Sequence, residues 1–284
     1  MLKKLSTIFI SVLFFGMTLF MSFWLTVSEE KLLSWTRFHV RRSLPRQVTV
    51  TIETLQTRFW GFELGQVTLR DTNQQRDWLK IDTVKVRFNV IALVFSQELP
   101  FEFNLYGGNG SGTIGYLPNS LIKLRVSNME LNWVPAIRRT QIIKSNPTLE
   151  LEGKFAPDTR IGNIQFQVRN IKMSGDKART NLSVNLPDTD LANIRADLKF
   201  NRKQVEMTID TTGDVEAHVE GRVYGDLGRI KRAKADLKLN ARIKKTYQAQ
   251  LGIFNSILNN YRSKNGRISI HLTGKLSAPQ IKKF

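Results

Sequence analysis

From Val48 onward the sequence alternates between apolar and polar residues with a period of two. The clearest stretch runs from Ala233 to Ile243, where every second residue is Ala, Leu or Ile and most residues between them are charged. Successive side chains of a strand point to opposite faces, so this pattern is typical of strands with one buried and one solvated face. The sequence therefore predicts a mainly β, antiparallel fold rather than a helical body.

The same alternation recurs along the rest of the chain, separated by turn signals such as Asn109-Gly110 and Asn146-Pro147. Further alternating stretches are 48–52, 67–69, 84–90, 101–105, 122–126, 129–133, 149–151, 164–168, 171–173, 182–186, 194–200, 205–209, 215–219 and 268–272. Helical spacing interrupts the alternation at about 134–144 and at 246–261, which predicts two short amphipathic helices.

Such a sheet has an apolar face that has to be covered, because burying apolar surface gains about 25 cal/mol per Å². Two short helices are too few for so many strands, so we expect an elongated, curled antiparallel sheet that forms a U-shaped trough. The pattern leaves open whether side chains or lipid acyl chains fill it. The candidate apolar groove consists of Val67, Leu69, Val86, Phe88, Phe101, Phe103, Leu105, Ile164, Phe166, Leu198, Phe200, Leu237 and Leu239.

An uncharged apolar run, Ser6 to Ser28, precedes the alternating part of the chain. About 20 apolar residues in a helix cross a bilayer, so this run is long enough to be a transmembrane anchor. The alternative is a cleaved signal peptide, whose apolar core is usually shorter and ends in small residues. The run ends instead in Phe23-Trp24-Leu25-Thr26-Val27-Ser28, which favours an uncleaved anchor. The anchor residues expected to lie in the membrane include Ile8, Phe9, Leu13, Phe14, Phe20 and Trp24.

The chain is thus expected to have three parts: an anchor at 1–28, a juxtamembrane helix at 29–45 and a β-rich domain at 46–284. The basic, aromatic-bearing helix either lies on anionic headgroups or continues the anchor helix into the domain. Counting Lys and Arg near the anchor would keep the domain in the cytoplasm, but long domains translocate largely regardless of charge. Because two lysines lead the apolar run, we predict a single-pass inner-membrane protein with its bulk in the periplasm.

The net charge of +19 and the pI near 10.3 favour anionic partners, and the anchor makes a membrane with phospholipid or other anionic lipid the simplest one. Most of the basic residues fall on the polar phase of the strands, so they are expected to form a solvated outer face. Nucleic acid is disfavoured as a partner, because aromatics such as Phe101, Phe103, Phe166 and Phe200 fall on the apolar phase.

No catalytic or cofactor motif emerges, and we predict a protein that is not an enzyme and has no cofactor or metal site. The chain has no cysteine, and His39, His218 and His271 lie far apart in the sequence. Gly110 to Gly115 matches the G-x-G-x-x-G fingerprint, but an expected strand follows it where the fingerprint requires a helix.

Three stretches carry a resemblance to a known family: LGQVTL at Leu64–Leu69, FNLYGG at Phe103–Gly108 and IHLTGKLSAP at Ile270–Pro279. With the N-terminal anchor, they resemble the type II secretion system protein N (GspN) family and, more broadly, AsmA-like proteins. The resemblance implies a bitopic inner-membrane protein with a periplasmic β-rich domain and no catalytic residues. It also implies association with the proteins of the secretion platform, whereas the AsmA-like relatives imply a lipid-holding groove. We therefore expect a non-enzymatic component of a type II protein secretion apparatus or, alternatively, a lipid-binding or lipid-transfer protein of the cell envelope.

Overall fold

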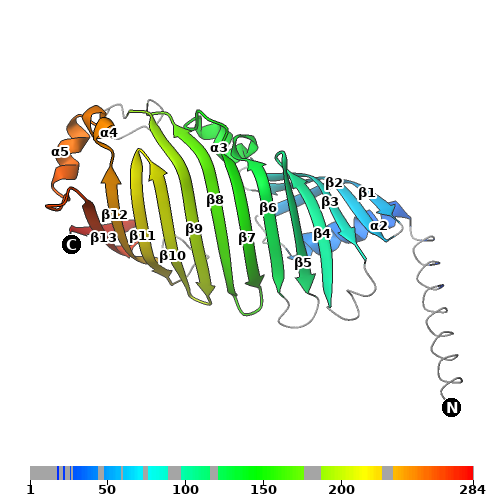
Figure 1. Cartoon of the computed structure of the whole chain (residues 1–284). Coiled ribbons are helices and arrows are strands. Elements are labelled where there is room, and N and C mark those ends of the chain that lie inside the picture. Colours follow the sequence, from blue (N-terminus) through cyan, green and yellow to red (C-terminus); the bar gives the residue numbers. More distant parts are fainter. Residues whose placement is uncertain are drawn as a thin grey trace, which may run out of the picture.

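The computed structural model describes residues 28–43, 48–58, 60–72, 76–88, 97–115, 121–175, 187–225 and 233–283, together with Thr18, Ser22 and Thr26. The chain is mainly β, with 64% of the described residues in strands, and these strands form one 14-stranded antiparallel sheet that does not close on itself (Figure 1). Every strand pairs with the strands that precede and follow it in the sequence. The predicted mainly β, antiparallel fold is confirmed.

The strands are long and nearly continuous along the chain. They are β1 (Val48–Arg58), β2 (Gly61–Asp71), β3 (Arg76–Arg87), β4 (Glu98–Leu105), β5 (Gly108–Gly115), β6 (Ile122–Glu130), β7 (Thr148–Ala156), β8 (Ile161–Met173), β9 (Thr189–Asn201), β10 (Gln204–Gly213), β11 (Val215–Tyr224), β12 (Lys234–Ile243), β13 (Ile268–Lys275) and β14 (Ala278–Lys283). The strand expected at 182–186 lies outside the described residues.

The described helices are α2 (Glu29–Ser43), the 3₁₀ helix η2 (Leu131–Trp133), α3 (Pro135–Thr140), α4 (Lys245–Gln250) and α5 (Ile253–Asn259). The prediction of one helix at 246–261 is wrong, because the segment divides into α4 and α5 at Gly252, whose φ of 52° is not helical. The predicted strand at 129–133 is also wrong beyond Glu130, since Leu131–Trp133 turns into η2.

Three residues with positive φ interrupt the strict alternation: Gln66 (51°), Asn128 (56°) and Asn170 (61°). At Asn128 the pairing of β6 with β7 shifts register, so Val126 and Met129 are both buried although they are three residues apart. A bulge of this kind inserts one residue and restores the apolar phase on the same face. These positions explain why the period-two pattern changes phase within single strands.

The cross-strand register places most apolar strand residues on one side of the sheet, because directly paired residues share a face. Phe103, for example, pairs with Val84 on one side and with Gly110 on the other. We call this side the apolar face; besides the predicted groove residues it carries Ile81, Val84, Leu124, Val126, Leu151, Phe155, Met207, Ile209, Val219, Ile270, Leu272 and Ile281. The opposite side, the polar face, carries the charged residues of the same strands.

Helices cover only parts of the apolar face. At one end, Leu32 and Leu33 of α2 pack on a buried cluster that includes Ile52 and Val67. Leu131 of η2 and its neighbour Val134 pack on a second cluster of β3 to β7, and residues of α4 and α5 pack on a third cluster of β11 to β13. Helices α3, α4 and α5 all lie at the same end of the strands (top in Figure 1).

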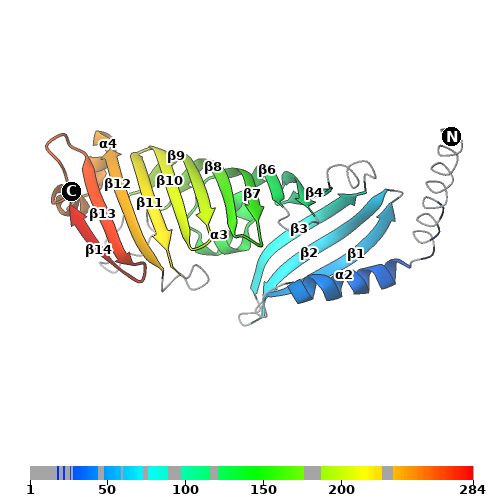
Figure 2. The same cartoon turned by 90° about the horizontal axis from the view of Figure 1, so that it is seen from below.

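Helix α2 also closes the outer edge of β1, as Figure 2 shows it lying beside that strand. Glu29 Oε1 accepts hydrogen bonds from the Thr57 backbone N–H at 2.8 Å and from the Thr57 hydroxyl at 3.1 Å. The Arg37 guanidinium donates to the Ile52 carbonyl, with 3.1 Å between Nε and the oxygen. Side chains of α2 therefore bind backbone groups that an edge strand would otherwise offer to another strand.

We expect Glu29→Ala to lower the free energy of unfolding by about 1 kcal/mol, because it removes hydrogen bonds between a carboxylate and the β1 edge. Glu30→Ala is the matched control, since the neighbouring Glu30 is exposed and shares the first turn of α2. Urea denaturation in detergent micelles, followed by tryptophan fluorescence, measures both. Equal loss in the two variants would show that Glu29 acts only through the helix dipole.

Among the described residues no helix is both long enough and apolar enough to cross a bilayer. The predicted anchor residues Ile8, Phe9, Leu13, Phe14, Phe20 and Trp24 lie outside the described residues. Of the apolar run, the structure describes Thr18, Ser22 and Thr26 as helical and Ser28 as outside a helix. The anchor therefore stays a prediction from the sequence.

Candidate functional site

The candidate site is the apolar face, and the structure places all of the predicted groove residues on it. Val67 and Leu69 lie on β2, Val86 on β3, Phe88 just after β3, Phe101, Phe103 and Leu105 on β4, Ile164 and Phe166 on β8, Leu198 and Phe200 on β9, and Leu237 and Leu239 on β12. Phe88 joins the set through its ring, whose centroid lies 5.8 Å from that of Phe62. The face is continuous from β1 to β14.

The groove residues differ in how far other side chains cover them. Val67, Phe103 and Leu105 are buried, because they belong to the clusters under α2 and under η2. The remaining ones are half-buried, among them Phe166, Leu198 and Leu237. Within the part of the chain that the structure describes, β8, β9 and β10 mainly contact other strands, and α4 meets them at Thr189, the first residue of β9, which hydrogen-bonds the Tyr247 hydroxyl. The middle of the apolar face is thus an uncovered apolar surface.

Glycines of β5 make room for aromatic rings on this face. The ring of Phe103 lies over Gly110 and the ring of Phe101 lies over Gly112, so that a Cβ at either glycine would overlap a ring. The two rings are stacked with centroids 6.0 Å apart and an interplanar angle of 19°. Aromatic cover of this kind compensates for the missing glycine side chains.

The sequence prediction of the site missed several residues that contribute equally. Met207 of β10 pairs with Leu198 of β9, and Val219 of β11 pairs with Leu239 of β12, so both belong to the central part of the face. Leu272 of β13 pairs with Leu237 and extends it further. The same alternation places these residues on the apolar phase, and the order of the strands would have assigned them to the groove.

The polar face carries basic and acidic side chains in cross-strand pairs. Arg87 and Glu102 approach to 3.0 Å, Arg125 and Glu152 to 3.3 Å, and Lys123 and Glu98 to 2.6 Å. Lys123 donates a hydrogen bond to Glu98 and thereby lowers the pKa of that carboxyl group below its usual value. This arrangement accords with the expected solvated outer face.

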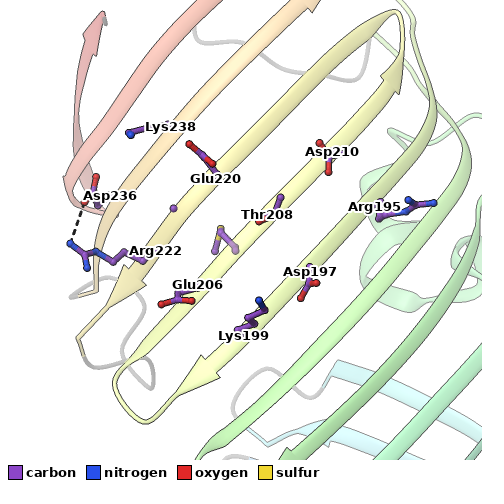
Figure 3. A pocket seen from close by; sticks show the side chains of 12 residues that line it. Arg195, Asp197, Lys199, Glu206, Thr208, Asp210, Glu220, Arg222, Asp236 and Lys238 are labelled. Atoms are coloured by element: carbon purple, nitrogen blue, oxygen red, sulfur yellow. Dashed lines mark ion pairs between the residues drawn. The ribbon is translucent and has the colours of Figure 1, made fainter.

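A hollow of about 630 Å³ lies on the polar face of β9 to β12 (Figure 3). Basic and acidic side chains line it in alternation, namely Arg195, Lys199, Arg222 and Lys238 against Asp197, Glu206, Asp210, Glu220 and Asp236. The side chains spread over four strands, and Arg222 and Asp236 form an ion pair at 3.7 Å. Because the hollow lies opposite the apolar face and carries mixed charge, it does not continue the apolar site.

The histidines are placed apart from one another. His39 lies on α2 and contacts the Trp35 carbonyl at 3.0 Å, whereas His218 on β11 pairs with Asp210 at 2.7 Å. His271 on β13 pairs with Asp236 at 2.7 Å. Among the described residues no three His, Asp or Glu side chains are grouped so that they could hold a metal ion.

The fingerprint-like glycines lie inside β5, and the next element along the chain is strand β6. Among the described residues a strand therefore follows the glycines, as expected from the sequence, where the dinucleotide fingerprint requires a helix.

His218 donates a hydrogen bond to the Asp210 carboxylate, and this bond, together with the charge of Glu220, raises the pKa of His218 above its usual 6.5. A pKa that is higher in the folded chain stabilises the fold fully below about pH 6.5, and that contribution is lost as the pH rises through the folded value. The pair is largely exposed, so we expect less than about 1 kcal/mol. Urea denaturation at about pH 5.5 and about pH 8.5 should show this loss in the wild type and its absence in His218→Gln. An unchanged pH dependence in the variant would contradict the assignment.

Comparison with known proteins gives no relative: no family model, no curated protein and no solved structure matches the chain. The resemblance to the GspN family stays a prediction.

Proposed function

We propose that the chain is a membrane-anchored, non-enzymatic protein of the cell envelope whose open sheet holds the acyl chains of lipids on its apolar face, as in an AsmA-like trough. The observation that carries this proposal is the uncovered middle of the apolar face, on β8 to β10, where Phe166, Leu198 and Met207 are half-buried. Contiguous apolar surfaces of more than a few hundred Å² are rare on soluble monomers and mark interaction sites.

The dimensions of the face suit an elongated apolar ligand. Neighbouring strands lie about 4.8 Å apart, so 14 strands extend over about 60 Å across the sheet. The hydrocarbon core of a bilayer is about 30 Å thick, so the face offers room for more than one acyl chain end to end. The charged side chains of the polar face, several of them in ion pairs, keep the other side in water.

Two of the sequence predictions bear on this proposal. The AsmA-like resemblance implies a lipid-holding groove, and the predicted periplasmic location would place the face in water, where a lipid gains most by burial. The role in a type II secretion apparatus rests on the resemblance alone and stays a prediction. Photo-crosslinking distinguishes the lipid-holding role from the secretion role.

The proposal is tested by photo-crosslinking in membranes that contain the full chain. A photoreactive amino acid replaces Met207 on the apolar face or, as a matched control, the adjacent Thr208 on the polar face. After irradiation, mass spectrometry of the purified protein reads the adduct. We expect a phospholipid-sized adduct at position 207 that is at least about tenfold stronger than at position 208, because the acyl chains contact one face only.

Equal lipid adducts at positions 207 and 208, or none at 207, would contradict the proposed lipid site. Adducts with other proteins at position 208, without lipid at 207, would support the secretion role instead. An adduct at position 239, where Leu239 lies on the same face, extends the test toward β12.

A further inference from the structure

The outward side of α2 carries two large exposed aromatics. Trp35 and Phe38 are each 60% exposed, as much as any large hydrophobic side chain that the structure describes. The ring centroids of Trp35 and His39 lie 4.1 Å apart, and those of Phe38 and His39 lie 5.4 Å apart. The three rings form one aromatic cluster on a single helix face, which is an unusual feature to leave in water.

The other side of α2 is committed to the sheet. Leu32 and Leu33 pack on the cluster of Ile52, while Glu29 and Arg37 bind the edge of β1. The exposed aromatics therefore cannot turn inward to the sheet without breaking these contacts.

The exposed side of α2 is also basic. Lys31, Arg41 and Arg42 are exposed, and none of them forms an ion pair with any residue that the structure describes. On a helix with about 3.6 residues per turn, Lys31, Trp35, Phe38 and Arg42 fall on one side, with Arg41 at its margin. Unpaired cations beside Trp and Phe are typical of helices that lie in the interface of an anionic membrane.

Helix α2 begins where the apolar run ends. Ser28 lies outside any helix, its hydroxyl accepts from the Lys31 N–H at 3.4 Å, and its carbonyl accepts from the Leu32 N–H at 3.1 Å. These two bonds place Ser28 at the N-cap position of α2. An anchor that ends at Ser28 holds the first turn of α2 at the membrane surface.

We propose that the exposed side of α2, formed by Lys31, Trp35, Phe38, Arg41 and Arg42, lies in the anionic headgroup layer of the membrane that holds residues 6–28. The inference rests on the anchor of the proposed function but not on the lipid site of the sheet. It places β1 nearest to the membrane and each later strand farther from it, because α2 flanks the outer edge of β1 (Figure 2).

The test uses the full chain, which has no cysteine, in lipid nanodiscs. Ser34→Cys introduces one label site on the exposed side of α2 and leaves both aromatics in place. The cysteine carries an environment-sensitive fluorophore, and the discs contain lipids with a nitroxide quencher near the headgroup. We expect strong quenching in discs of phosphatidylglycerol with phosphatidylcholine and weaker quenching in phosphatidylcholine alone. Trp133→Cys, at a side chain that is 59% exposed and lies on η2 rather than on α2, should remain unquenched.

Two paired variants separate docking from folding, and both are made in the Ser34→Cys background. Arg41→Glu with Arg42→Glu should shift the docked fraction by about fivefold or more per residue, whereas Arg138→Glu with Arg139→Glu on α3 makes the same charge change without effect. Trp35→Ala with Phe38→Ala should abolish quenching while the urea midpoint of the sheet stays unchanged, since both side chains are exposed.

A Leu13→Cys label reports the anchor independently. Quenching of that label by deep nitroxide lipids, together with an unquenched Ser34→Cys label, would overturn the docking of α2 and leave the proposed function standing. An unquenched Leu13→Cys label would instead overturn the anchor itself. A Ser34→Cys label that is quenched equally in neutral and anionic discs would refute the part assigned to the arginines.

Discussion

Replacing Leu198 and Leu237 together by glutamate is expected to empty the apolar face of lipid. Both side chains are half-buried on that face, on β9 and β12. Met207 pairs with Leu198 and Gly221 pairs with Leu237, so these two residues connect them across the sheet. An ionised carboxylate beside an acyl chain loses its water without gaining a partner, which costs several kcal/mol. With a photoreactive residue at Val219, we expect the lipid adduct to fall at least about tenfold.

The matched control is Lys199→Glu with Lys238→Glu. These residues neighbour Leu198 and Leu237 in the sequence but lie on the polar face, where both side chains are exposed. The control introduces the same two glutamates into the same two strands, so it should retain the adduct at Val219. If both double variants lose the adduct alike, the lipid is not held by the apolar face.

The second large effect is expected from Gly112→Val, which should lower the free energy of unfolding by about 3 kcal/mol. A Cβ at Gly112 would overlap the Lys123 carbonyl oxygen of the neighbouring strand and lie 2.6 Å from Cζ of Phe101. The backbone oxygen belongs to the ladder between β5 and β6, so it cannot move aside without breaking that ladder. Urea denaturation in detergent micelles measures the loss.

Ser111→Val serves as the control on the same strand. Ser111 is exposed on the polar face, and valine favours strands, so its unfolding free energy should stay within about 0.5 kcal/mol of the wild type. A Gly112→Val chain that unfolds like the Ser111→Val chain would mean that β5 and β6 separate at little cost, and that the rings of Phe101 and Phe103 do not fix the glycine strand.

The sequence was sufficient to predict the faces of the sheet but not how they are covered. Alternation assigns each side chain to one of two sides, and residues as far apart as Val67 and Leu239 proved to share a side. Which of them a helix covers depends on contacts between distant segments, such as Leu131 with the β3 to β7 cluster, and no local period encodes these. Val67 is buried and Leu239 half-buried for this reason.

The errors in secondary structure have local physical causes. The apolar stripe through Tyr247, Leu251 and Phe254 has helical spacing, yet Gly252 adopts a positive φ and splits the helix into two short pieces that still pack their apolar residues together. The prediction of a strand at 129–133 was wrong beyond Glu130, because Asn128 forms a bulge and the chain then leaves the sheet at Leu131. A short alternation is compatible with a 3₁₀ turn as well as with a strand.

The strands follow one another in the sheet in the same order as in the sequence, which affects how such a protein folds and how its length can change in evolution. Because no strand crosses over another, every pairing joins segments that follow one another in the chain, as in a solenoid, and each hairpin can form as soon as it has been synthesised. Insertion or loss of one hairpin leaves the remaining pairings intact and changes the span of the sheet by about 10 Å. The distance that the apolar surface covers is therefore a modular quantity, set by the number of hairpins rather than by a redesign of the core.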